Sequence, residues 1–230
     1  MKKNLLGLIA LILITNLSFG QNTVSIDVAK QIGSLHNKYI AQGIQNTPLT
    51  NSALKDNFMK IQVDGVDDKT KNEIIDFFTK NNTSKQEEII MNYLKSTSSR
   101  DLYNSTKNLI INAKNFSQVL KDLDLKLEDA KKLTGKEQEI LFTLIETSRS
   151  SLNFWLPKSS GGQGGGSSYT DTSKINWGAI GYSDGMGAVG ALIRTFYLAA
   201  GGPLTWGAIV GAIGWGAAWG SGSALLYQLM

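Results

Sequence analysis

The sequence predicts an all-α protein made of a helical bundle, a flexible Gly/Ser linker and a C-terminal glycine-rich helical hairpin. The first observation is that apolar residues follow a helical period through most of the chain before Pro157. The second is that 18 of the 24 glycines lie in residues 158–230, where Asp184 and Arg194 are the only charged residues after Lys174. Two parts of such different composition predict two structural units.

Residues 1–20 have the features of a secretory signal peptide. Two lysines precede the apolar stretch Leu5–Leu17, and small residues at Ser18 and Gly20 come before a cleavage point that leaves Gln21 at the N-terminus. A retained membrane helix is the alternative, but this stretch is shorter than the roughly 20 residues that a bilayer span needs. We therefore expect an exported protein, located in the cell envelope or secreted.

Residues 21–157 are expected to form the soluble bundle of about six amphipathic helices. Apolar side chains recur every three or four residues in six segments, which are 28–39, 70–78, 84–94, 102–113, 119–133 and 137–155. Pro157 stops the last of them. Between the first two segments, Asp64-Gly65 could turn a short β-hairpin over residues 61–66.

Three of these helices are expected to begin with a capping box. In this motif a hydroxyl side chain and a carboxyl side chain three residues later bond reciprocally to the backbone at a helix start. The matching pairs are Thr70 and Glu73, Ser84 and Glu87, and Thr134 and Glu137.

Residues 158–174 are rich in glycine and serine, a composition that behaves as a flexible coil. They are expected to be the linker between the bundle and the last unit, residues 175–230.

Residues 175–230 carry small residues at every fourth position, which predicts two helices that pack closely along smooth faces. Glycine can end one helix and proline can start the next, so the expected turn is Gly201, Gly202 and Pro203. The helix-packing residues are expected to be Ala179, Gly187, Ala191, Ala208, Gly211, Ala212, Gly216, Gly220 and Ala224.

This hairpin is expected to insert into a membrane. Glycine in a helix interior costs about 1 kcal/mol against alanine, whereas close packing of small faces associates helices in lipid. Residues 204–229 would span roughly 39 Å, enough for a hydrocarbon layer of about 30 Å. Tryptophan favours membrane interfaces, and the expected interfacial residues are Trp177, Trp206, Trp215 and Trp219. The alternative is a glycine-rich hairpin packed in water against the bundle.

The two charged residues of the hairpin allow two interpretations. In the first, Ser183-Asp184 caps a shorter helix from Gly185 to Ala200, and Arg194 reaches outward along the helix. In the second, both are polar groups inside a pore or an assembly. We favour the first interpretation from the sequence.

The runs Trp177–Ala191 and Trp206–Ala217, with Gly201-Gly-Pro203 between them, resemble the glycine-zipper class II bacteriocins. The resemblance covers about 55 of the 230 residues. It implies helices that associate through GxxxG faces and make target membranes leaky. Two features depart from that family: a Sec-type signal peptide replaces the double-glycine leader, and a domain of some 135 residues precedes the hairpin.

Composition excludes several function classes. The chain has no cysteine and one histidine, His36, so sites that need a thiol or two histidines are excluded. His36 is expected at the surface or half-buried on its helix. The net charge of +4 is spread too evenly for a nucleic-acid-binding stripe. We expect no enzyme, no metal site and no cofactor.

The expected function is that of an exported protein with a membrane-inserting glycine-zipper hairpin, in its most specific form a bacteriocin-like membrane permeabiliser. The alternative is a non-toxic cell-envelope anchor whose helical bundle binds a protein partner. The expected partners are a lipid membrane and further copies of the chain, which would associate through the small-residue faces.

Overall fold

The computed structural model describes residues 23–44, 50–81, 83–156, 158, 162–165, 175–199 and 205–229, and within these it contains nine helices and no strand. The all-α fold class is therefore confirmed. The expected signal peptide, most of the linker and the expected turn at Gly201, Gly202 and Pro203 lie outside the described residues.

Seven helices precede the glycine-rich segment and two lie within it. The first seven are α2 (Ile26–Ile44), α3 (Asn51–Lys60), α4 (Asp68–Lys80), α5 (Thr83–Met91), α6 (Thr97–Ile111), α7 (Phe116–Ala130) and α8 (Gly135–Trp155). The last two are α9 (Trp177–Ala199) and α10 (Trp206–Leu229). All six segments with helical periodicity fall on helices, and α3 is an additional helix that the periodicity did not indicate.

The start of α3 and the turn after it both have local causes. The side chain of Thr50 accepts a hydrogen bond from the N–H of Ala53 at 3.3 Å and so caps α3. The β-hairpin expected over residues 61–66 is wrong, because the described residues there form a turn without strands. Gly65 has a φ of 72°, and the N–H of Val66 donates to the carbonyl of Val63 at 3.0 Å.

The expected capping boxes at Thr70 and Thr134 are replaced by other contacts. Asp67, not Thr70, caps α4, since its carboxylate accepts from the N–H of Thr70 at 2.8 Å. Thr134 makes no side-chain cap hydrogen bond. Glu137 instead accepts from the N–H of Ser96 at 2.7 Å, at the start of α6. Partial burial alone would raise the pKa of Glu137, but the bonds from Ser96 and its neighbours hold that pKa below its usual value.

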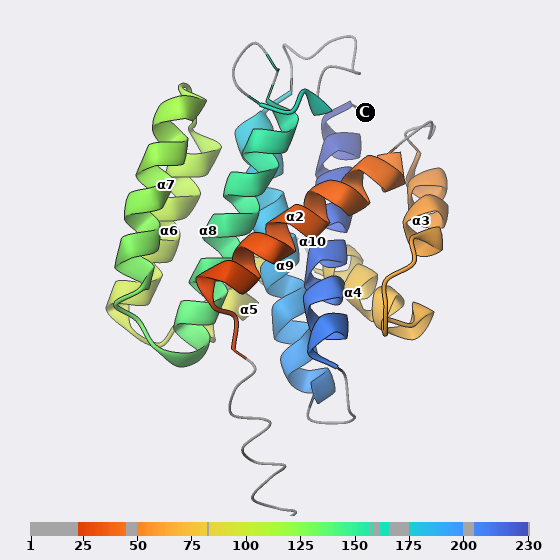
Figure 1. Cartoon of the computed structure of the whole chain (residues 1–230), viewed down its shortest axis with the longest axis horizontal. Coiled ribbons are helices and arrows are strands. Elements are labelled where there is room, and N and C mark those ends of the chain that lie inside the picture. The colour runs from red at the N-terminus through yellow and green to blue at the C-terminus, as the bar shows by residue number, and fades with distance from the viewer. Residues whose placement is uncertain are drawn as a thin grey trace, which may run out of the picture.

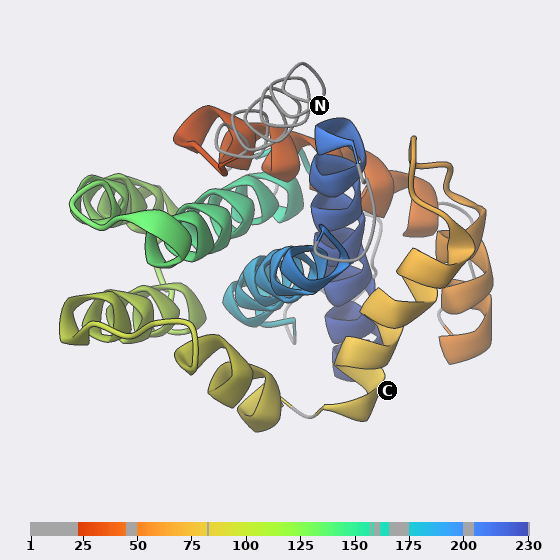
Figure 2. The ribbon, with the colours of Figure 1, turned by 90° about the horizontal axis from the view of Figure 1, so that it is seen from below.

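The helices α9 and α10 lie at the centre of the molecule, with the other helices around them (Figures 1 and 2). Helix α2 packs on α10 and α8, α8 packs on α9, and α3 and α4 lie on the far side of α10. Buried apolar residues from both parts of the chain form one hydrophobic core. The helices before the linker therefore bury apolar faces on α9 and α10.

Close approach of backbones explains the glycines at the contact between α9 and α10. A Cβ on Gly187 would lie 2.6 Å from the carbonyl oxygen of Gly216, and one on Gly216 would lie 2.6 Å from Cβ of Ala191. A Cβ on Gly220 would lie 2.8 Å from the carbonyl oxygen of Ser183. These distances are too short for real Cβ atoms, so only glycine permits the two helices to approach this closely.

Other glycines of the hairpin serve contacts with the surrounding helices. A Cβ on Gly181 would lie 2.9 Å from Cδ2 of Leu152 on α8. A Cβ on Gly214 would lie 2.7 Å from Cβ of Leu35 on α2. The small-residue pattern therefore supplies close packing in several directions, and not along the α9–α10 contact alone.

Adding a methyl group at Gly187 is expected to destabilise the protein by about 1–3 kcal/mol, because the new Cβ meets backbone atoms of α10 that cannot rotate away. The measurement is urea unfolding of Gly187→Ala followed by circular dichroism. Gly207→Ala is the matched control, since no atom lies within 4 Å of a Cβ at Gly207. It should leave stability unchanged or raise it by up to about 1 kcal/mol. Equal destabilisation of both variants would contradict the close-packing account.

Candidate functional site

The buried pair of helices α9 and α10 is the candidate functional site, and α10 is the more apolar of the two. Of the helices that the structure describes, α10 is the one long and apolar enough to cross a bilayer by length and composition. It contains no charged residue. Most of it is buried inside the protein, and a core helix of a soluble protein has the same length and composition. Helix α10 therefore has a composition that suits a lipid bilayer, and in this structure the other helices of the protein surround it.

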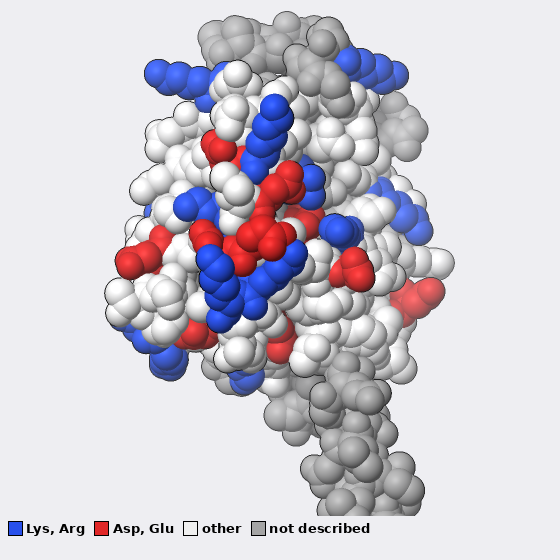
Figure 3. Space-filling model, turned by 60° about the vertical axis from the view of Figure 1, so that its left-hand side comes forward, with Lys and Arg blue, Asp and Glu red and all other residues white. Residues whose placement is uncertain are grey.

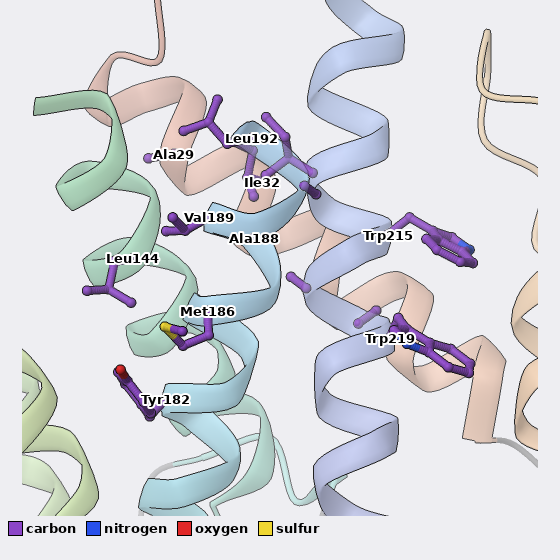
Figure 4. Packing of buried hydrophobic residues seen from close by; sticks show 14 of the residues in the cluster. Ala29, Ile32, Leu144, Tyr182, Met186, Ala188, Val189, Leu192, Trp215 and Trp219 are labelled. Atoms are coloured by element: carbon purple, nitrogen blue, oxygen red, sulfur yellow. The ribbon is translucent and has the colours of Figure 1, made fainter. Parts of the chain in front are cut away.

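Two of the tryptophans expected at a membrane interface are core residues in this structure. Trp215 is fully buried, and its indole N–H donates to the carbonyl of Phe58 at 3.1 Å. Trp219 stacks on Trp215 with ring centroids 6.3 Å apart. Both side chains point from α10 away from α9 (Figure 4), and both meet the ring of Phe58 edge to face.

The other two tryptophans lie near the ends of the hairpin helices. Trp177, the first residue of α9, stacks on Trp155 of α8 at 5.4 Å. Trp206, the first residue of α10, is partly buried and packs against the core. The first of these contacts ties the start of α9 to the end of α8.

The remaining expected packing residues contact other parts of the molecule. Ala208 faces the turn at Gly65, and Gly211 faces Val63. Ala212 is buried in the core. Ala179 and Ala224, from the open end of the hairpin, line a cleft that is described below.

Asp184 is fully buried at the junction of α2, α8 and α9, which corrects its expected role as a helix cap. Its Oδ2 accepts a hydrogen bond from the hydroxyl of Ser151 and lies 3.1 Å from Nε2 of His36. The cap of α9 is Asn176, whose side chain accepts from the N–H of Ala179 at 2.9 Å. Helix α9 therefore begins a full two turns before Asp184.

His36 is also fully buried, so the expectation of a surface or half-buried histidine is wrong. Its Nε2 lies 3.2 Å from the hydroxyl of Ser221 on α10, and its Nδ1 lies 2.7 Å from Oδ1 of Asn37. A sequence signal for this burial exists: His36 is four residues from both Ile32 and Ile40, which are fully buried on the same face of α2.

The side chains of His36, Ser151 and Asp184 bring an imidazole, a hydroxyl and a carboxylate together. These are the groups of a hydrolase triad, but all three are fully buried in this state and out of reach of a substrate. What the cluster does is to connect three helices, α2, α8 and α9, by polar contacts in an otherwise apolar core. Ser221 extends it to α10 and accepts a bond from the indole N–H of Trp155 at 3.3 Å.

Arg194 does not pair with Asp184. Its guanidinium donates to Glu73 on α4 through Nη2 at 3.0 Å and Nε at 3.2 Å. Its side chain is 39% exposed, so this ion pair lies at the edge of the molecule. The two charges of the hairpin thus have different environments, one in the core and one at the surface.

A cleft of about 720 Å³ lies between α4, α5 and α6 on one side and the hairpin on the other. At its inner end, Oε1 of Glu87 accepts from Nζ of Lys107 at 2.5 Å and from the hydroxyl of Tyr182 at 2.9 Å. The Tyr182 hydroxyl also lies 2.6 Å from that of Tyr103, and burial raises the pKa of Tyr103. The walls are mostly apolar, and Ala179 and Ala224 form part of them.

The charged side chains outside this core are of mixed sign. On the face that Figure 3 shows, acidic side chains gather near the middle and basic side chains lie around them. Within the described residues, no group of three or more histidine, aspartate or glutamate side chains is placed to hold a metal ion.

Comparison of the chain with protein-family models, with curated proteins and with solved structures found no match.

Replacing Asp184 by alanine is expected to lower the free energy of unfolding by about 3 kcal/mol, because Ser151 and His36 would lose a buried partner. The measurement is urea unfolding at neutral pH. Glu73→Ala is the control, since it removes the partly exposed acid that pairs with Arg194 and should cost about 0.2–1 kcal/mol. A loss for Asp184→Ala no larger than for the control would contradict the role given to the buried cluster.

Proposed function

We propose that this chain is an exported membrane-active protein whose helices α9 and α10 insert into a lipid bilayer and permeabilise it. The observation that carries the proposal is the position of α10, an uncharged helix of bilayer length held at the centre of a layer of amphipathic helices. Before insertion, that layer keeps the hairpin soluble.

The surface of helix α10 is suited by composition both to the protein core and to a hydrocarbon layer. Its buried side chains are apolar or small, and its backbone groups are satisfied within the helix, as a bilayer requires. The helices around it are amphipathic, with charged outer faces that suit water or a lipid headgroup region. Insertion then exchanges one apolar environment for another, and the surrounding helices release their faces from the hairpin.

The close contact of α9 and α10 favours their insertion as a pair. Packing between small residues does not depend on water and also operates in lipid. The expected signal peptide supplies the route to an outer membrane surface or to the medium. Inserted pairs of α9 and α10 would then associate through the small-residue faces that are not used within the pair, and this assembly would make the membrane leaky, as the resemblance to glycine-zipper bacteriocins implies.

The direct test uses the mature full chain from Gln21 and vesicles of phosphatidylethanolamine and phosphatidylglycerol loaded with a self-quenched dye. We expect dye release that grows with protein concentration. If the vesicles retained their dye at every protein-to-lipid ratio, the proposal of membrane permeabilisation would be wrong.

A cross-link between α10 and α2 is expected to abolish dye release, because the hairpin could no longer leave the surrounding helices. The chain has no cysteine, so the pair Leu35→Cys and Gly214→Cys can be oxidised selectively. The matched control is Ala191→Cys with Gly216→Cys, which links α9 to α10 and leaves the hairpin free to move. In either pair the helices must separate by about 1 Å to accommodate a disulfide.

Dithiothreitol should restore release by the Leu35/Gly214 pair and leave the control unchanged. Full release by the oxidised Leu35/Gly214 pair would show that the hairpin does not need to leave α2.

A second candidate is an envelope anchor whose helical part binds a partner. The cleft beside Glu87 and Lys107 favours it, since its volume lies in the range of ligand sites and it combines apolar walls with charged groups. Under this function the hairpin inserts stably, and the protein floats with the vesicles in a density gradient without releasing dye.

A further inference from the structure

The cleft between the outer helices and the pair α9 and α10 holds one ion pair at its inner end. Glu87 of α5 and Lys107 of α6 are the only charged residues among the described residues that line it. Their side chains are 22% and 28% exposed, and Nζ of Lys107 lies 2.5 Å from Oε1 of Glu87. The same Nζ lies 5.7 Å from the centroid of the Tyr182 ring. One positive and one negative group are therefore held side by side in a partly enclosed space.

Part of the hydrogen-bonding capacity of this ion pair is unused. Among the described residues, Lys107 and Tyr182 both donate to Oε1 of Glu87, and none donates to Oε2. Nζ of Lys107 carries three N–H groups and makes one hydrogen bond to a described atom. A ligand can therefore donate to Oε2 of Glu87 and accept from Lys107 without breaking the bond between the two side chains.

The walls of the cleft suit a hydrocarbon chain. Phe78 and Ile111 line it from the outer helices, and the small residues Ala179, Gly220 and Ala224 line it from α9 and α10. Small residues leave a smooth surface, along which an unbranched chain can lie in contact over its length. The volume of about 720 Å³ is in the range of sites for drug-sized ligands. The cleft therefore combines a doubly charged inner end with apolar walls.

Two exposed side chains near the end of α10 indicate a lipid as the source of such a ligand. Tyr227 lines the cleft and is 85% exposed, and Leu229, two residues further on, is 41% exposed. Tyrosine has an apolar ring and a polar hydroxyl, and it is enriched where a membrane meets water. The exposed rim of the cleft therefore suits contact with a layer of lipid headgroups.

We propose that this cleft binds one phospholipid with an ethanolamine headgroup. The ammonium group donates to Oε2 of Glu87, the phosphate accepts from Nζ of Lys107, and an acyl chain lies along α9 and α10. A ligand with a single charge would lie beside a group of like sign, whereas a zwitterion complements both side chains. The inference deepens the second candidate function by naming a ligand for the cleft, and the choice of a lipid rests on the proposed contact with a membrane.

The test is calorimetric titration of the mature full chain with lauroyl-lysophosphatidylethanolamine below its critical micelle concentration. We expect saturable binding, and binding of lauroyl-lysophosphatidylglycerol, which lacks the ammonium group, should be about tenfold weaker or more. Glu87→Gln and Lys107→Gln should each weaken binding of the ethanolamine lysolipid by about tenfold. Glu88→Gln is the matched control, because Glu88 follows Glu87 on α5 but pairs with Lys85 outside the cleft.

A variant that fills the cleft keeps the inference falsifiable if a charge variant does not fold. Ala224 is only partly buried, so Ala224→Leu should remove binding while the circular dichroism spectrum stays helical. The inference would be wrong if binding were not saturable, if the two lysolipids or free leucine bound equally well, or if Ala224→Leu bound as the native protein does.

Dye release from vesicles separates this inference from the proposed permeabilisation. Release without lysolipid binding would exclude the lipid site and leave permeabilisation standing. Lysolipid binding without release would support the lipid site and exclude permeabilisation, because the lysolipid titration needs no bilayer.

Discussion

The constraint on which the rest of the structure depends is the close approach of helix backbones around α9. Gly187 and Gly216 bring α9 against α10, and Gly181 and Gly185 bring it against α8. Backbone atoms of α10 lie against Gly187, and side chains of α8 fill the space beside Gly181 and Gly185, so any carbon added to α9 at these positions meets backbone or a packed side chain. The surrounding helices then take their positions from this central group of three.

A second consequence of that packing is that polar groups become trapped in the core. Asp184 lies between Gly181 and Gly185 along α9, on the side where α8 comes closest, so its carboxylate has to find partners inside the protein. His36 and Ser151 supply them from two other helices. Buried polar contacts of this kind are costly, and they also disfavour alternative registers in which the same groups would have no partner.

The outer helices lie between this interior and water. Their apolar faces cover α9 and α10, and their outer faces carry acidic and basic groups of mixed sign (Figure 3). Individual surface ion pairs such as that of Lys132 with Asp129 contribute little to stability. The fold is therefore held mainly by apolar contact with α9 and α10, and the proposed membrane insertion would release the same contact.

The sequence by itself determined the all-α class, six of the seven helices before the linker and the need for close packing in the glycine-rich segment, because helical periodicity and small-residue spacing are local properties of the chain. The sequence did not determine which helix each glycine would contact, that Glu137 would accept hydrogen bonds from the backbone just before α6, or that His36 and Asp184 would meet. Those partners are distant in sequence, and only the tertiary structure brings them together. The tertiary structure also decided that α9 and α10 lie inside the ring of other helices, because the amphipathic helices need an apolar surface to cover and α10 is apolar and buried along most of its length.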